Sequence, residues 1–156
     1  MRDILLVTIN AKWIHPSLAL RLLRANLGSL ENRCEILEFA LRQPLAEKTA
    51  PVSAARPKIL GVSVSIWNHT ATLELLGELE KTWAAQGEKP VVVLGGPEVS
   101  HLSPEAEIFW YADYVIRGEG ETAFRTLCEN ILTQPEKIAG HPQFISAEPV
   151  KLEQIK

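Results

Sequence analysis

The sequence predicts an α/β fold: a doubly wound, five-stranded parallel sheet of the flavodoxin or Rossmann-like type. Short apolar, β-branched runs alternate along the chain with segments whose apolar residues recur every three or four positions. This is the pattern of buried parallel strands joined by crossover helices. The later runs also break into glycine-rich loops, as parallel strands do where they present backbone to a ligand.

Five apolar runs are predicted to be the strands: residues 4–9, 34–39, 59–66, 91–94 and 114–116. The second run alternates polar and apolar side chains, which favours an edge position with one less-buried face. The third run is almost continuously apolar, which favours the centre of the sheet.

Two helices are predicted between the first three strands. Pro16 and Ser17 stand where the first helix begins, and Gly28 is its predicted C-cap. Residues 43–57 are rich in alanine and proline and are expected to contain one short helix.

Two further helices follow the third and fifth strands. The first of them opens at Thr70 or Thr72 and ends near Gly87. The other carries an apolar stripe at helical spacing that comprises Phe124, Leu127, Cys128 and Ile131. Strands and helices therefore alternate as expected of right-handed βαβ units.

Composition restricts the function. A chain of 156 residues that is 46% hydrophobic is expected to form one domain. A net charge of -3, with both signs interspersed, disfavours nucleic acid and anionic membrane surfaces as partners. The first apolar run is too short for a signal or membrane segment, so a cytoplasmic protein is expected. Cys34 and Cys128 lack metal-binding spacing and are expected to be reduced core thiols.

Four loops follow the predicted strands at the carboxyl edge of the sheet, where ligands of open α/β sheets bind. They are residues 10–15, 66–69, 95–101 and 118–122, and they hold three of the four histidines and two of the four tryptophans. The simpler interpretation is that the glycines in these loops only turn the chain.

Two of these loops, with the strands before them, resemble a known family. Residues 91–98 read VVVLGGPE and residues 113–122 read DYVIRGEGET. The chain resembles, over residues 3–133, the cobalamin (B12)-binding domain at the N-terminus of B12-dependent radical SAM proteins. That domain has a Gly-Gly loop followed by D-x-V-x-x-G-E-G-E. The resemblance names cobalamin as the ligand.

The resemblance also implies roles for single residues. Gly95 and Gly96 would let the nucleotide tail of the cofactor lie against the backbone, so a bulky residue at either is expected to remove binding and leave the fold intact. Ser63 and Ser65 occupy an S-x-L element, with Ser63 placed to contact the buried dimethylbenzimidazole. Asn10 begins the loop where related domains carry D-x-H-x-x-G, which this chain lacks.

The missing histidine is the lower cobalt ligand of those related domains, so the resemblance implies base-off and His-off binding. His15 lies in the same loop and is the one candidate cobalt ligand. Its alternative role is a hydrogen bond to the backbone at the start of the following helix.

The remaining implied contacts lie on the other loops. Trp67 and Asn68 lie where a corrin ring would rest, although Trp67 could instead plug the core. Glu98 and His101 are candidates to bind the amide arms or ribose phosphate. Glu121 and Thr122 are expected to complement the positive end of the last helix. The complete set of implied cofactor-binding residues is Asn10, His15, Ser63, Ser65, Trp67, Asn68, Gly95, Gly96, Pro97, Glu98, Gly118, Glu119 and Gly120.

The resemblance divides the chain into a cobalamin-binding domain at residues 1–140 and a linker at residues 141–156. The linker would lead to the protein's own C-terminal radical SAM domain, which would bring S-adenosylmethionine and a [4Fe–4S] cluster. This chain has no C-x-x-x-C-x-x-C motif and is not expected to be catalytic alone. Trp13, Trp110 and Tyr111 are candidate surfaces for that partner domain.

Two other interpretations remain open. One is a flavodoxin-like domain that binds a nucleotide or flavin phosphate, although Asn10-Ala11-Lys12-Trp13 is no phosphate-binding loop. The other is a ligand-free, receiver-like interaction domain, although Asn10 and Asn68 replace the acidic residues that a receiver needs.

Overall fold

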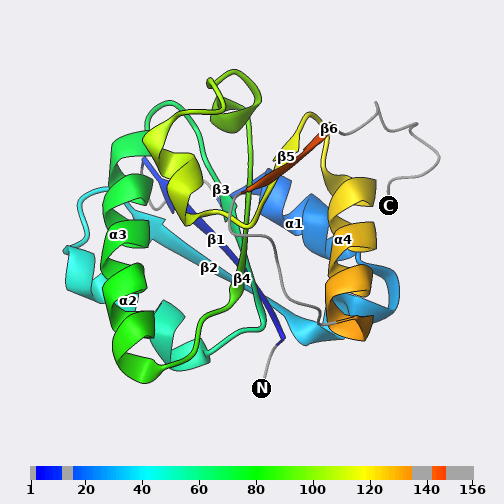
Figure 1. Cartoon of the computed structure of the whole chain (residues 1–156), viewed down its shortest axis with the longest axis horizontal. Coiled ribbons are helices and arrows are strands. Elements are labelled where there is room, and N and C mark those ends of the chain that lie inside the picture. The colour runs from blue at the N-terminus through cyan, green and yellow to red at the C-terminus, as the bar shows by residue number, and fades with distance from the viewer. Residues whose placement is uncertain (1–2, 12–15, 135–141, 147–156) are drawn as a thin grey trace.

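A computed structural model describes residues 3–11, 16–134 and 142–146. They form an α/β fold around a parallel sheet of six strands in the order β2-β1-β3-β4-β5-β6 (Figure 1). The doubly wound parallel fold is confirmed. The strands are β1 (Ile4–Asn10), β2 (Cys34–Ala40), β3 (Ile59–Ser63), β4 (Val91–Gly95), β5 (Tyr114–Arg117) and β6 (Gln143–Ser146).

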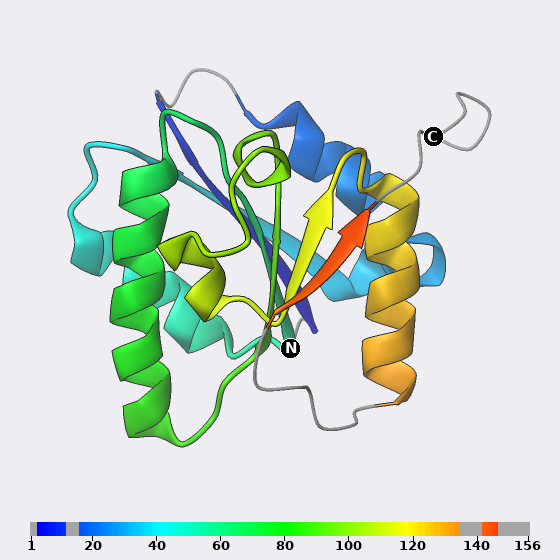
Figure 2. The same cartoon turned by 45° about the horizontal axis from the view of Figure 1, so that its top comes forward.

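Helices cover both faces of the sheet, α1 and α4 on one side and α2 and α3 on the other (Figures 1 and 2). The α-helices are α1 (Leu18–Ala25), α2 (Leu45–Ala55), α3 (His69–Gln86) and α4 (Glu121–Thr133). Three 3-10 turns complete the described elements: η1 (Gly28–Arg33) joins α1 to β2, whereas η2 (Glu98–Ser100) and η3 (Glu107–Tyr111) both lie between β4 and β5. No helix of the described ranges is both long and apolar enough to cross a bilayer.

The sixth strand was not predicted. Residues 143–146 were assigned to the linker, whereas they pair in parallel with β5. The Phe144 ring packs edge-on against Phe109 with centroids 5.1 Å apart, and the Arg117 guanidinium lies 4.6 Å from the Phe144 centroid. A strand of four residues with mostly exposed side chains has little apolar periodicity, so these tertiary contacts place it and its sequence does not.

Two other boundaries differ from prediction. Helix α1 ends at Ala25 instead of reaching Gly28, because both Asn26 nitrogens donate to the Leu22 carbonyl and close the last turn. Strand β3 ends at Ser63, three residues early, because the backbone then turns and Ser65 N–H donates to Asn68 Oδ1 at 2.8 Å.

The core consists of two apolar layers, one on each face of the sheet. Along β1, Leu5, Val7 and Ile9 belong to the layer under α2 and α3, whereas Ile4 and Leu6 belong to the layer under α1 and α4. This alternation assigns every odd-numbered position of β3 and β4 to the α1–α4 side. The same face carries the site.

Glu38 on β2 holds both ends of the loop that joins β1 to α1. It accepts hydrogen bonds from the Asn10 side chain and the Ser17 backbone, and its Oε2 lies 2.8 Å from Arg21 Nη1. Partial burial raises the pKa of Glu38, but these three partners lower it by more, so its pKa lies below the usual 4.5.

A Glu38→Gln substitution is expected to destabilise the protein by about 1–2 kcal/mol at pH 7, because it removes charge-assisted hydrogen bonds. A carboxylate with a lowered pKa contributes stability above its unfolded pKa and loses it as pH falls through the folded pKa. Urea unfolding should therefore show the difference shrinking below pH 4.5. A difference that stayed constant with pH would contradict this role of the charge.

Candidate functional site

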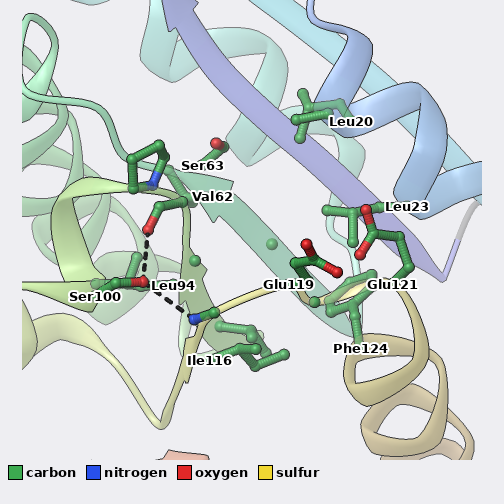
Figure 3. A pocket seen from close by; sticks show the side chains of 18 of the residues that line it. Leu20, Leu23, Val62, Ser63, Leu94, Ser100, Ile116, Glu119, Glu121 and Phe124 are labelled. Atoms are coloured by element: carbon green, nitrogen blue, oxygen red, sulfur yellow. Dashed lines mark hydrogen bonds between the residues drawn. The ribbon is translucent and has the colours of Figure 1, made fainter. Parts of the chain in front are cut away.

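A cavity of about 360 Å³ lies at the carboxyl ends of β3, β4 and β5, between the sheet and the helices α1 and α4 (Figure 3). This volume falls within the range of ligand pockets, about 300–1,000 Å³. The position is the one where open α/β sheets bind ligands.

Small residues on the inner face of two central strands create the space. Ser63 on β3 pairs with Gly95 on β4, and both line the cavity. Gly61 lies two residues before Ser63 on the same face of β3 and leaves space for the side chains of Leu6 and Phe124. A Cβ at position 61 would lie 2.8 Å from Leu6 Cδ2 and 3.2 Å from Phe124 Cζ. The cavity thus extends from the rim to the Gly61 row, roughly 6.6 Å along the strands.

The walls between sheet and helices are mainly apolar. Helix α1 contributes Leu20 and Leu23, α4 contributes Phe124, and β5 contributes Ile116 (Figure 3). Leu20, Phe124 and Ile116 are buried core residues, so this part of the cavity is held rigidly by the fold. Walls of this kind suit an apolar, uncharged part of a ligand.

The two glycines after β4 play different parts. A Cβ on Gly95 would find Ile116 O at 3.9 Å as its nearest neighbour, which is an ordinary contact. A Cβ on Gly96 would lie 2.5 Å from Val64 O and 2.7 Å from Val64 N, and the φ of Gly96 is +104°. Gly95 therefore keeps the cavity open, whereas Gly96 is required by the backbone itself.

Ser100 joins the two glycine loops at the rim. Its Oγ accepts a hydrogen bond from Gly118 N–H at 3.1 Å and donates to Gly96 O at 3.4 Å (Figure 3). Gly118 has a φ of +92°, which a glycine adopts without strain. The segments after β4 and β5 thus form one continuous edge of the cavity.

Two carboxylates, Glu119 and Glu121, stand on the α4 side of the cavity (Figure 3). Among the described residues that line it there is no lysine or arginine. Glu121 Oε2 is buried and has no hydrogen-bond partner among the described residues. A phosphate group is therefore poorly matched to this end of the cavity.

Seven of the residues implied by the sequence resemblance line the cavity: Ser63, Gly95, Gly96, Pro97, Gly118, Glu119 and Gly120. His101 lines it as well. Gly61, Ser100 and Phe124 also line the cavity although the sequence resemblance does not imply it, and Glu121 lines it although its position predicts only a helix end. Gly61 was the detectable signal, because a glycine inside a buried strand marks a close approach.

Asn10, Ser65 and Asn68 are not among the lining residues, and hydrogen bonds within the fold use the side chains of Asn10 and Asn68 and the backbone N–H of Ser65. Asn10 donates to Glu38, as described above. Asn68 is fully buried, and its Nδ2 donates to Ile9 O at 2.9 Å while its Oδ1 accepts from Ser65 N–H. The Asn68 side chain therefore ties β1 to the β3–α3 loop.

Trp67 and Glu98 lie elsewhere on the rim. Trp67 is 57% exposed and the adjacent Ile66 is 79% exposed, so the alternative that Trp67 plugs the core is wrong. Glu98 Oε2 lies 2.7 Å from His69 Nδ1. His15 lies outside the described residues.

Metal-binding side chains do not cluster in the described part of the chain, where no group of three or more His, Cys, Asp or Glu residues could hold an ion. Cys34 and Cys128 are both buried in the layer under α1 and α4. Burial raises the pKa of the Cys128 thiol well above its usual range, so the thiol stays protonated and unreactive.

In the comparison with protein families, a family model described as a B12 binding domain matches residues 4–128. The matched range runs from β1 into α4 and contains the twenty described residues that line the cavity. Comparisons with curated proteins and with solved structures gave no match.

Proposed function

The chain belongs to the family of B12-binding domains, and on that premise we propose that the nucleotide tail of cobalamin occupies the cavity between the sheet and helices α1 and α4. The observation that carries the proposal is the cavity itself, open at Ser63 and Gly95 and walled by Leu20 and Phe124. Dimethylbenzimidazole is apolar and uncharged, which suits the apolar walls of this cavity.

The corrin ring is proposed to lie over the carboxyl rim of the sheet, outside the cavity. The exposed Ile66 and Trp67 offer apolar surface there, which suits a large flat macrocycle. The cofactor phosphate would remain at the solvent side of the rim, away from Glu119 and Glu121.

The cofactor is proposed to bind base-off and His-off. A benzimidazole held between sheet and helices is unavailable to the cobalt of its own molecule. The sequence after β1 lacks the D-x-H element, and the nearest histidine in that loop is His15. The chain would thus hold the cofactor by its tail and leave the lower face of cobalt without a nitrogen ligand.

Titration with hydroxocobalamin, followed by reduction to cob(II)alamin and electron paramagnetic resonance, tests both parts of the proposal. We expect saturable binding and a spectrum without nitrogen superhyperfine splitting. A His15→Ala variant should give the same spectrum. Splitting that disappears in His15→Ala would make His15 the ligand, and the absence of any binding by the full-length protein would overturn the proposal.

The electrostatics of the cavity weigh against a flavin or nucleotide phosphate as ligand. Such ligands need backbone N–H groups or cations around the phosphate. This cavity presents the Glu119 and Glu121 carboxylates beside the N-terminus of α4. A receiver-like module is also disfavoured, since Asn10 and Asn68 are used in internal hydrogen bonds.

In the full-length protein we propose that the partner is a C-terminal radical SAM domain, which would supply S-adenosylmethionine and the [4Fe–4S] cluster. The support is the likeness of residues 113–122 to the D-x-V-x-x-G-E-G-E segment of that class. Trp110 is 73% exposed and provides apolar surface for such a contact.

A further inference from the structure

We infer that Glu121 accepts a hydrogen bond from a ribose hydroxyl of the bound nucleotide tail, and so selects ligands that carry this sugar. The inference rests on the proposed function, because it assigns a partner within the same cavity. It gives Glu121 a role beyond the helix-end position that its sequence predicts.

The first support is the state of the carboxylate. Glu121 lines the cavity, and its Oε2 is buried with no hydrogen-bond partner among the described residues. A buried carboxylate oxygen that accepts no hydrogen bond lowers the stability of the folded protein, and native proteins rarely contain one. A ligand that brings a donor to this oxygen gains a charge-assisted hydrogen bond.

The second support is the surroundings of Glu121. It occupies the first turn of α4, where a negative side chain is favoured by the helix dipole. Leu23 and Phe124 line the same cavity, and neither carries a hydrogen-bond donor. Neither of these two residues can therefore supply the donor that Oε2 lacks.

The chemistry of the nucleotide tail indicates which donor fits. The benzimidazole ring, with one nitrogen bonded to the sugar, has no N–H group. The phosphate is an anion and is repelled by Glu119 and Glu121. The ribose hydroxyls lie next to the base, are neutral and donate, so they are the groups of the tail that match Oε2.

The test compares cobalamin with cobinamide, which keeps the corrin ring but lacks the base, ribose and phosphate. In Glu121→Ala, cobalamin affinity should fall by about 10-fold or more, as expected for loss of a hydrogen bond to a charged group. Cobinamide affinity should be unchanged. Glu121→Gln, which keeps the shape and a carbonyl acceptor, should lie between Glu121→Ala and the original protein.

Glu47→Ala is the matched control. Glu47 is also in the first turn of a helix, α2, but it is exposed and lies outside the cavity. It should therefore reproduce any general effect on a helix without changing affinity. Circular dichroism confirms that each variant is folded.

The outcomes separate the two proposals. Equal losses for cobalamin and cobinamide, or no loss for either, would overturn the role of Glu121 while cobalamin binding stands. If the unsubstituted protein bound neither compound, the proposed function would fail and the inference would fail with it.

Discussion

A Gly95→Val substitution is expected to weaken cobalamin binding by at least about 100-fold, or about 2.7 kcal/mol, while the protein stays folded. Gly95 lines the cavity on its inner strand face, opposite α1 and α4. The valine side chain would project into the space where the benzimidazole is proposed to lie. Two solid groups cannot share that volume, and the walls are too well packed to move aside.

The fold should tolerate this change. The nearest atom to a Cβ at position 95 is Ile116 O at 3.9 Å, and Gly95 has no positive φ. Valine is also a favourable strand residue. The free energy of unfolding, measured with urea, is therefore expected to change by less than about 1 kcal/mol.

Gly77→Ala serves as the control for this experiment. Gly77 lies in α3 on the other side of the sheet, and an added Cβ would meet only Tyr111 Oη at 3.5 Å. Cobalamin affinity should be unchanged in this variant. Undiminished affinity in a folded Gly95→Val protein would show that the tail does not enter the cavity.

The sheet was largely predictable, because most of its strands coincide with short apolar runs in the sequence. Strand β2 was placed at an edge by its alternating pattern and lies there, and the continuous run of β3 lies in the interior. Strand β6 has no such local pattern, because the Phe144 contacts with Phe109 and Arg117 hold it in place. Contacts between distant segments are not visible in a short window of sequence.

The lining of the cavity was predictable where glycine backbone forms it. It was less predictable where the lining depends on the direction of a side chain. The glycines after β4 and β5, which the sequence singled out, line the cavity. Asn68 is a polar residue in a loop at the carboxyl edge of the sheet, as a binding residue would be. Its side chain nevertheless turns inward and donates a hydrogen bond to Ile9 O. Glu121 is an acidic residue at the start of a helix, where such residues are common, yet it lines the cavity. Only the packing of α1 and α4 on the sheet decides such directions.

A Gly96→Ala substitution is expected to destabilise the protein by about 3–5 kcal/mol, because strain and lost hydrogen bonds add. The φ of +104° is strained for any residue with a side chain, and the new Cβ would lie 2.5 Å from Val64 O. Val64 N–H donates to Gly95 O at 2.8 Å, and Val64 O accepts from Glu98 N–H at 3.1 Å. The displaced backbone would lose both bonds.

This expectation corrects the sequence-based one, in which either glycine could be replaced without harm to the fold. Urea unfolding and cobalamin titration of both variants would separate the two roles. In Gly96→Ala, binding should fall in proportion to the folded fraction and recover when an osmolyte restores folding, because the cavity itself is not filled. In Gly95→Val, it should stay low in a fully folded protein. If Gly96→Ala kept its stability, the backbone after β4 would have to be free to move away from Val64, and the rim of the cavity would not be rigid.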